Sequence, residues 1–303
     1  MIDVDDVRAA AARMGGRIRH TPTFSAGDSL WLKLEYLQHA GSFKTRGMLN
    51  QILSAPSLPA AGIVTASGGN AGLAAAYAAR ELGVPAEIYV PVTAPPVKVA
   101  KLGKLGARVV QVGNEYAEAA AAASLRAAET GALYCHAYDD PAMVAGNGTL
   151  GLELLEQMPG GFDTALVAVG GGGLIAGVIA ALSPEVRVVS VEPSTSACLH
   201  AALRSGAPVD VPVSGVAADS LGARRAGQIA FDLASSFEVP ALLVDDAAIV
   251  DARRRLWDDY RIVVEHGTAA AYAALTSGVY QPAPGERVVV LLCGANTDPS
   301  DLA

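Results

Sequence analysis

From residue 61 onward, short apolar runs rich in β-branched residues alternate with longer stretches rich in alanine and leucine. Short apolar runs bounded by glycine or proline predict buried strands, whereas the longer stretches predict helices. The predicted strands cover residues 61–65, 86–90, 109–112, 165–169, 186–191 and 287–292, with another near Leu242. The predicted helices cover residues 70–82, 116–128 and 148–157, with one that follows Pro95-Pro96 and ends at Leu105 and one that begins at Gly173. This alternation is typical of an α/β protein with parallel sheets covered by helices.

The predicted elements fall into two groups, one ending near residue 128 and one beginning near residue 148, which indicates two domains. The alanine run at residues 119–123 predicts a well-formed helix with one closely packed face. Residues 205–216 are rich in proline, serine and valine, so we expect an irregular crossing between helices there.

The composition narrows the class of protein. A chain of 303 residues with 51% hydrophobic content suits a folded enzyme-sized protein, and its net charge of −8 argues against nucleic acid or a membrane as a partner. Small molecules remain as partners. No apolar run approaches the roughly 18 residues of a membrane span, and no secretory signal is visible, so a cytoplasmic location is expected. The three cysteines lack metal-ligand spacing, so neither a disulfide framework nor a metal site is expected.

Lys44 is one of five lysines in a chain with seventeen arginines, and it lies in the segment Gly41-Ser42-Phe43-Lys44-Thr45-Arg46-Gly47. An arginine stays protonated, whereas a buried lysine can lose its proton and act as a nucleophile and then as a base. The alternative is an ordinary lysine in a glycine-flanked turn. The catalytic interpretation gains weight from the other motifs.

Four consecutive glycines, Gly170 to Gly173, follow a predicted strand and precede Leu174 and an apolar helix. Bare backbone N–H groups at a helix N-terminus can bind an anion such as a phosphate. The alternative is a flexible strand-to-helix turn. The spacing is neither that of a dinucleotide fingerprint nor that of a Walker A loop, so nucleotide cofactors are poorly supported.

Two further polar segments follow predicted strands. Ser67-Gly68-Gly69-Asn70 opens a predicted helix, where Ser67 and the loop amides could hold a carboxylate and Asn70 could either contact a ligand or cap the helix. Cys293 begins the segment CGAN after the run 288–292, at the strand end where open α/β sheets bind ligands. An inert buried thiol is the alternative for Cys293.

Taken together, these four segments resemble the serine/threonine dehydratase family of fold-type II pyridoxal-phosphate enzymes. Their order and spacing carry the resemblance, and it extends over most of the chain through the segments HTP at 20–22, LE at 34–35, HAYDD at 136–140, VEP at 191–193 and ADS at 218–220. The resemblance implies two open, twisted, mainly parallel sheets flanked by helices, the tryptophan synthase β-like fold. Residues 1–40 and 140–303 would form a large cofactor-binding domain, and residues 41–139 a small domain that closes over the substrate.

The resemblance also implies pyridoxal 5′-phosphate as the cofactor and a homodimer as the assembly. Lys44 would bind the cofactor covalently and serve as the base. The other cofactor contacts would be Phe43 on the pyridine ring, Asn70 on the ring oxygen, the amides of Gly170, Gly171, Gly172, Gly173 and Leu174 on the phosphate, and Cys293 at the ring nitrogen. The substrate carboxylate would be held by Ser67, Gly68, Gly69 and Asn70. A monovalent or divalent cation could also bind, but no signal in the sequence identifies one.

The implied activity is dehydration and deamination of L-serine or L-threonine to a 2-oxo acid and ammonia, a lyase reaction of amino-acid catabolism. Gly68 stands where serine racemases carry a serine, and Thr45 where cysteine and threonine synthases carry an aspartate, so racemisation and β-replacement are expected to be weak. The alternatives are another β-hydroxy amino acid as substrate, a racemase or β-replacement enzyme, and a non-catalytic cofactor-binding protein. No carboxylate or histidine stands out near the motifs as an acid for the leaving hydroxyl.

Overall fold

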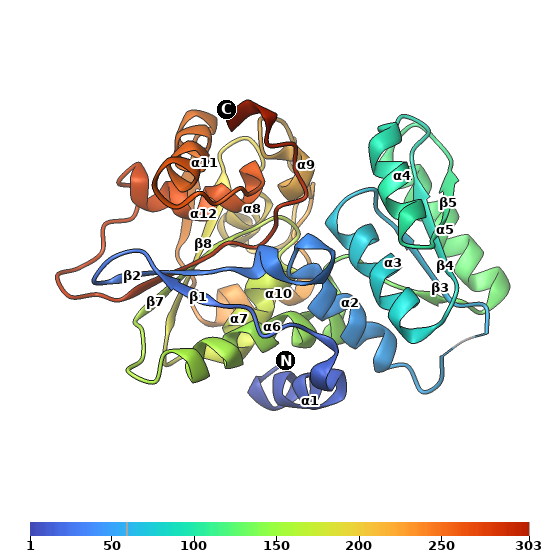
Figure 1. Cartoon of the computed structure of the whole chain (residues 1–303), viewed down its shortest axis with the longest axis horizontal. Coiled ribbons are helices and arrows are strands. Elements are labelled where there is room, and N and C mark those ends of the chain that lie inside the picture. Colours follow the sequence, from blue (N-terminus) through green and yellow to red (C-terminus); the bar gives the residue numbers. More distant parts are fainter. Residues whose placement is uncertain (59, 303) are drawn as a thin grey trace.

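Two mainly parallel sheets organise residues 1–58 and 60–302, which are the residues described by this computed structural model (Figure 1). The larger sheet has the strand order β1-β2-β10-β7-β8-β9, and the smaller has the order β5-β4-β3-β6. The strands of the larger sheet are β1 (Thr23–Ser25), β2 (Leu30–Lys33), β7 (Thr164–Ala168), β8 (Arg187–Pro193), β9 (Ala241–Val244) and β10 (Val288–Leu291). The strands of the smaller sheet are β3 (Ile63–Ala66), β4 (Ala86–Val90), β5 (Arg108–Gln111) and β6 (Leu133–Tyr134). Within the described chain, only β1 and β2 pair antiparallel.

Helices cover both faces of each sheet. They are α1 (Val4–Met14), α2 (Lys44–Leu53), α3 (Asn70–Leu82), α4 (Pro96–Lys104), α5 (Tyr116–Thr130), α6 (Pro141–Gln157), α7 (Gly173–Leu182), α8 (Cys198–Ser205), α9 (Ala218–Leu221), α10 (Gln228–Ser236), α11 (Asp246–Tyr260) and α12 (His266–Thr276), with single 3-10 turns at Gly15–Arg17, Glu35–Leu37, His39–Gly41 and Ser300–Leu302. One core of the larger sheet is packed by α6, α7, α8 and α10, and the other by α11 and α12. None of the helices in the described ranges is long and apolar enough to cross a membrane.

Most of the predicted elements are confirmed, and so is the predicted α/β class. Helix α3 and strand β4 have the predicted bounds, and the other predicted strands differ by a few residues at their ends. The buried residues of α5 recur every four positions, at Ala119, Ala123 and Ala127, which is the closely packed alanine face that the sequence predicts. The smaller sheet lies within residues 41–139 and the larger sheet outside them. The domain boundaries themselves stay a prediction.

Two helices differ from the sequence prediction. Lys44 is the first residue of α2 and therefore does not lie in a turn, and α6 begins at Pro141 instead of residue 148. The first half of α6 contains Gly146 and Gly148, which weaken a helix prediction. The structure gives the reason for both glycines, because a Cβ at Gly146 would lie 2.7 Å from the Arg46 carbonyl oxygen and one at Gly148 would lie 2.6 Å from that of Gly177. Close helix packing thus outweighs helix propensity here.

A buried ion network anchors α2 to the larger sheet. The Arg46 guanidinium forms paired bonds to two carboxylates, those of Glu35 and Glu153, with N···O distances of 2.6 to 2.8 Å. Lys33 on β2 adds a bond to Glu153 of 2.8 Å. Removing one partner of such a buried network leaves an uncompensated charge and costs about 3 to 5 kcal/mol. The network therefore fixes the first turn of α2, which carries Lys44.

Candidate active site

One cavity brings together all the residues that the sequence predicts to contact the cofactor. Its lining includes Phe43, Lys44, Asn70, the segment 170–174 and Cys293. The segments meet because the Phe43 N–H donates to the Cys293 carbonyl oxygen (3.0 Å) and Ser42 forms a β-bridge with Gly294. This pairing holds the start of α2 against the end of β10, at the carboxyl edge of the larger sheet.

The Lys44 side chain is half-buried at the start of α2, and its Nζ donates to the carbonyl oxygen of Ala137 at 2.6 Å. Loss of hydration around the ammonium lowers the pKa of Lys44 to about 8, against the smaller opposing effect of Cys293. At neutral pH the amine therefore spends about a tenth of its time uncharged, since the pKa lies roughly one unit above the pH. A lysine in this state can act as a nucleophile or a base.

The tetraglycine loop connects β7 to α7, and packing explains why its residues lack side chains. A Cβ at Gly171 would lie 2.4 Å from the ring of Tyr138, and one at Gly172, which has φ +93°, would lie 2.3 Å from the Ala230 Cβ. Close packing thus requires these glycines whether or not a ligand binds. The case for an anion site rests on a different observation, namely that the N-terminus of α7, whose first N–H groups lack partners within the helix, opens into the same cavity as Lys44.

Asn70 does not cap α3, so the capping alternative is wrong. Gly69 is the N-cap residue, and Asn70 is the first residue of the helix. Its Nδ2 donates to both carboxylate oxygens of Glu265 at 2.9 Å, and its Oδ1 accepts from Asn296 Nδ2 at 2.7 Å. The side chain therefore lies across the space between the smaller and larger sheets.

Residues 67–70, which the sequence predicts to bind the substrate carboxylate and which we call the carboxylate loop, lie beside a second cavity that adjoins the one around Lys44. Gly68, Gly69 and Asn70 line it, whereas the Ser67 hydroxyl accepts a hydrogen bond from the Gly69 N–H within the loop (3.2 Å). A Cβ at Gly68 would meet its nearest atom, Val90 Cγ1, at 3.5 Å, which is ordinary contact. A side chain at position 68 is therefore sterically possible, and its absence leaves open space next to the loop.

Cys293 lies at the end of β10 with its side chain buried among cavity residues. Its Sγ lies 3.2 Å from Thr268 Oγ1, and burial raises the pKa of the thiol to about 12. The group is consequently a neutral, weakly polar sulfur at physiological pH. A neutral sulfur is a suitable neighbour for the ring nitrogen of the predicted cofactor.

Glu265 is a cavity residue that the sequence did not reveal. It is 7% exposed and accepts hydrogen bonds from Asn70 Nδ2 and from the backbone N–H of Asn296 (2.8 Å). Burial raises the pKa of its carboxyl group, and these N–H donors act in the opposite direction. The structure thus adds a carboxylate to the cavity, while the expectation that no side chain there serves as an acid for the leaving hydroxyl stays a prediction. No signal in the sequence marks Glu265, because its partners lie 195 and 31 residues away along the chain.

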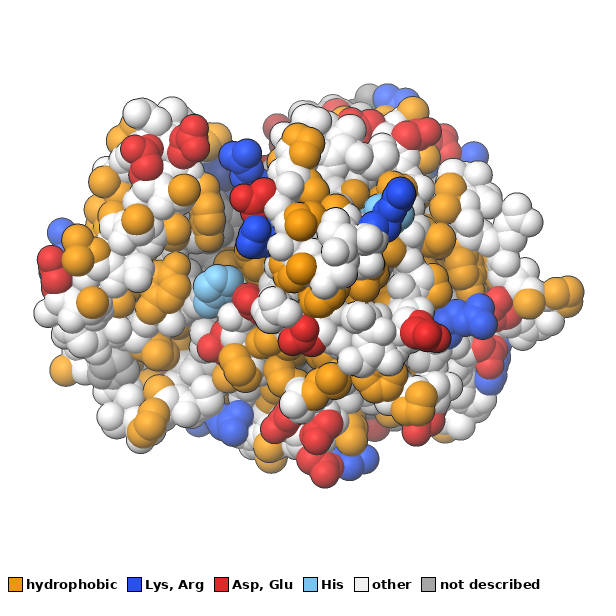
Figure 2. Space-filling model, turned by 180° about the vertical axis from the view of Figure 1, so that it is seen from behind, with side chains coloured by type: hydrophobic (Ala, Val, Ile, Leu, Met, Phe, Trp, Pro, Cys, Tyr) orange, Lys and Arg blue, Asp and Glu red, His pale blue; other side chains and the backbone are white. Residues whose placement is uncertain are grey.

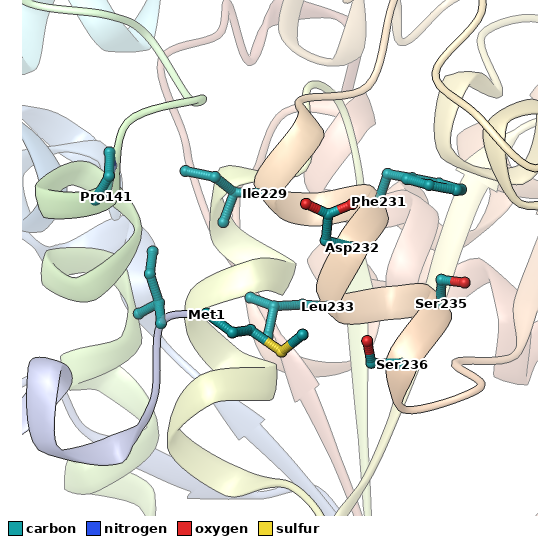
Figure 3. A pocket seen from close by; sticks show the side chains of 9 residues that line it. Met1, Pro141, Ile229, Phe231, Asp232, Leu233, Ser235 and Ser236 are labelled. Carbon is teal, nitrogen blue, oxygen red and sulfur yellow. The ribbon is translucent and has the colours of Figure 1, made fainter.

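A larger hollow of about 700 Å³ lies elsewhere, between the N-terminus and α10 (Figure 3). Figure 3 shows the side chains that line this hollow, among them Met1 and Leu233, with Asp232 as its acidic residue. It shares no residue with the lining of the two cavities described above. Among the described residues, no group of three or more His, Cys, Asp or Glu side chains is placed to bind a metal ion.

Comparisons with known proteins agree with this geometry. The profile of the family described as pyridoxal-phosphate dependent enzyme matches residues 16–294. An L-threonine ammonia-lyase from Geobacter sulfurreducens is 37% identical over 305 residues, which cover 96% of this chain and 75% of that protein. A phenylserine dehydratase from Ralstonia pickettii is 35% identical over 312 residues, covering 99% and 95%. The solved structure of maize serine racemase superposes with a TM-score of 0.92 at 30% identity, covering 99% of this chain and 95% of that one.

Proposed function

The chain belongs to the pyridoxal-phosphate dependent enzyme family, and from this premise we propose that it dehydrates and deaminates L-serine or L-threonine to a 2-oxo acid and ammonia. The family, the two-sheet fold and the cofactor that the sequence predicts are confirmed by these relationships. The relatives named threonine ammonia-lyase and phenylserine dehydratase support a lyase that acts on a β-hydroxy amino acid. The proposal includes a cytoplasmic homodimer.

The residues of the cavity fit pyridoxal 5′-phosphate, a molecule with an aldehyde, an anionic phosphate and a ring nitrogen. Lys44 offers an amine for the aldehyde, and the N–H groups at the start of α7 offer donors for the phosphate. Phe43 and Cys293 offer an apolar face and a neutral sulfur for the ring. When bound, the cofactor withdraws electrons from the substrate and makes the proton on its α-carbon acidic.

Lys44 Nζ is the group that we assign to removal of this α-proton. Its lowered pKa makes the neutral amine available near pH 8, and the carbonyl oxygen of Ala137 receives one of its N–H bonds and so limits its orientation. Arg46 supports this role from outside the cavity, because its buried ion pairs fix the turn of α2 that carries Lys44.

Glu265 acts on Asn70 and not on the substrate in this proposal. Its two oxygens accept N–H bonds from Asn70 and Asn296, so the carboxylate is occupied as an acceptor and orients the Asn70 amide. Closure of residues 41–139 over the substrate would exclude water while the α-proton is held on Lys44.

The observation that carries the proposal is the position of a partly neutral Lys44 in one cavity with the α7 N-terminus, in a chain closely related to ammonia-lyases. The test is ammonia release from L-serine, L-threonine, a phenylserine and a β-hydroxyaspartate, measured on the cofactor-loaded enzyme. We expect release from L-serine or L-threonine and a loss of at least several orders of magnitude in Lys44→Ala, since one residue is both anchor and base. A near-normal rate in that variant would contradict the mechanism.

Serine racemisation is the second candidate, because the maize serine racemase has such a similar structure. Gly68 weighs against it, since this position offers no hydroxyl to protonate the second face of the substrate. Chiral analysis of the products formed from L-serine separates the two activities.

A further inference from the structure

The second cavity is the hollow between the smaller and larger sheets, and its walls carry charge. Among its lining residues are Gly68 and Gly69 of the carboxylate loop, Lys98 and Lys101 of α4, and Asp219 of α9. Figure 2 shows, from behind, a hollow between two lobes with basic and acidic side chains along its sides. The Lys98 ammonium forms an ion pair with the Asp219 carboxylate across this hollow.

Within the described ranges, side-chain hydrogen bonds or ion pairs connect residues 60–134 with residues 141–302 at three residue pairs. In two of them Asn70 donates to Glu265 and accepts from Asn296, and the third is the ion pair between Lys98 and Asp219. The Asn70 contacts are deep, since Glu265 is 7% exposed. In contrast, the side chains of Lys98 and Asp219 are 29% and 68% exposed, so their pair closes the outer part of the hollow.

A pair with this exposure is weak, typically about 0.2 to 1 kcal/mol, and it can therefore exchange partners readily. Its position makes such an exchange relevant to a ligand. A Cβ at Gly68 would lie 4.0 Å from Lys98 Cδ, so the Lys98 stem passes alongside the loop 67–70, which the sequence predicts to hold the substrate carboxylate. Of the five lysines of the chain, Lys33 is buried, Lys44 is half-buried and the other three lie on α4. Among these three, Lys98 forms an ion pair with Asp219 on the opposite wall of the hollow.

We propose that Lys98 binds the carboxylate of the incoming amino acid and that Asp219 is the partner it exchanges for this carboxylate. The inference rests on the proposed function for the identity of the ligand as an amino acid. In the free enzyme the pair with Asp219 holds α4 near α9 and keeps the ammonium beside Gly68. The arriving carboxylate takes the place of the Asp219 carboxylate, and product release restores the pair.

Three variants test this proposal. Lys98→Met keeps an unbranched apolar stem and removes the charge, Lys98→Arg keeps the charge, and Lys104→Met removes a charge from an exposed position of the same helix outside the cavity. A lost hydrogen bond to a charged group weakens binding about tenfold or more. We expect KM to rise by this factor in Lys98→Met, with kcat within about threefold, whereas Lys98→Arg restores most of the loss and Lys104→Met has no effect on KM.

Asp219→Asn tests whether the substrate carboxylate replaces Asp219 as the partner of Lys98, or whether the ion pair between Lys98 and Asp219 has only a structural role. If Asp219 competes with the substrate, this variant lowers KM by up to about fivefold, the value of the pair itself. If the pair only stabilises the closed shape, Asp219→Asn and Lys98→Met raise KM together, and this outcome overturns the proposal.

A binding measurement makes the test independent of turnover. L-Alanine has no β-hydroxyl to eliminate, so its affinity for the loaded enzyme can be measured by calorimetry in the wild type and in the same variants. We expect weaker binding in Lys98→Met alone. If the wild type and Lys98→Met bind L-alanine with the same affinity, or if neither binds it, the proposal is overturned. If no β-hydroxy amino acid releases ammonia but L-alanine binding still depends on Lys98, the proposed function fails and the carboxylate contact stands.

Discussion

The pKa of Lys44 gives a quantitative prediction for the way in which the cofactor-free protein takes up pyridoxal phosphate. Only the neutral amine can attack an aldehyde, so the rate of attachment follows the neutral fraction of Lys44. Burial lowers the pKa of this amine from 10.5 to about 8. At pH 7 the neutral fraction is then about 9%, compared with about 0.03% for an ordinary lysine, which is an advantage of roughly 300-fold.

The pH dependence of the attachment rate measures this effect directly. Cofactor-free protein is mixed with pyridoxal 5′-phosphate between pH 6.5 and 9.5, the product is trapped with borohydride, and the modified lysine is identified by peptide mass spectrometry. Because the pKa of Lys44 is depressed, its neutral form grows about tenfold per pH unit below pH 8 and levels off above it. The trapping rate at Lys44 is expected to follow this curve.

A free lysine derivative added to the same reaction is the control. The side-chain amine of free lysine has a pKa near 10.4, so trapping on the derivative is expected to keep rising across the whole pH range. If trapping at Lys44 instead rises in parallel with this control up to pH 9.5, burial does not depress the pKa of Lys44 and the argument for a neutral base at physiological pH is refuted.

Four substitutions at three positions test the other assigned residues. Gly171→Ala places a Cβ where the Tyr138 ring now lies, so we expect the loop to shift and cofactor affinity, measured by equilibrium dialysis, to fall at least tenfold; unchanged affinity would remove the loop from the cofactor site. Gly68→Ser fits with ordinary contacts and is expected to increase D-serine formation relative to ammonia release, so an unchanged product ratio rejects the missing-hydroxyl explanation. Cys293→Ser is expected to fold and retain most ammonia release. Cys293→Asp, which adds a charge beside the predicted ring nitrogen, is expected to slow release and alter the absorption spectrum with substrate, and a well-folded variant with neither change would exclude Cys293 from the site.

The sequence predicted the elements whose signals are local. Helix α3 is followed by Gly83, which has φ +67° and is a common C-terminal signal, and strand β4 is bounded by Pro85 and Pro91, so both were placed correctly. Helix α2 gave no such signal, because its buried face includes polar residues, Arg46 and Asn50 among them. A pattern of apolar positions cannot reveal a helix whose buried side chains are charged or amide groups with partners elsewhere in the chain.

The same distinction separates the predicted and the missed residues of the candidate site. Lys44, the tetraglycine loop and Cys293 lie within short motifs, since backbone loops at strand ends provide the groups that face a ligand, and these motifs could be found without the fold. Glu265 and Asn296 hold Asn70 in place, and Arg46 holds the turn of Lys44, through contacts that span from 11 to 226 residues of sequence. Such supporting groups need only to arrive at the correct point in space, so no short motif marks them in the sequence. Their roles become visible once β10, α12 and α2 are seen to meet at the carboxyl edge of the larger sheet, where the Phe43 N–H bonds to Cys293.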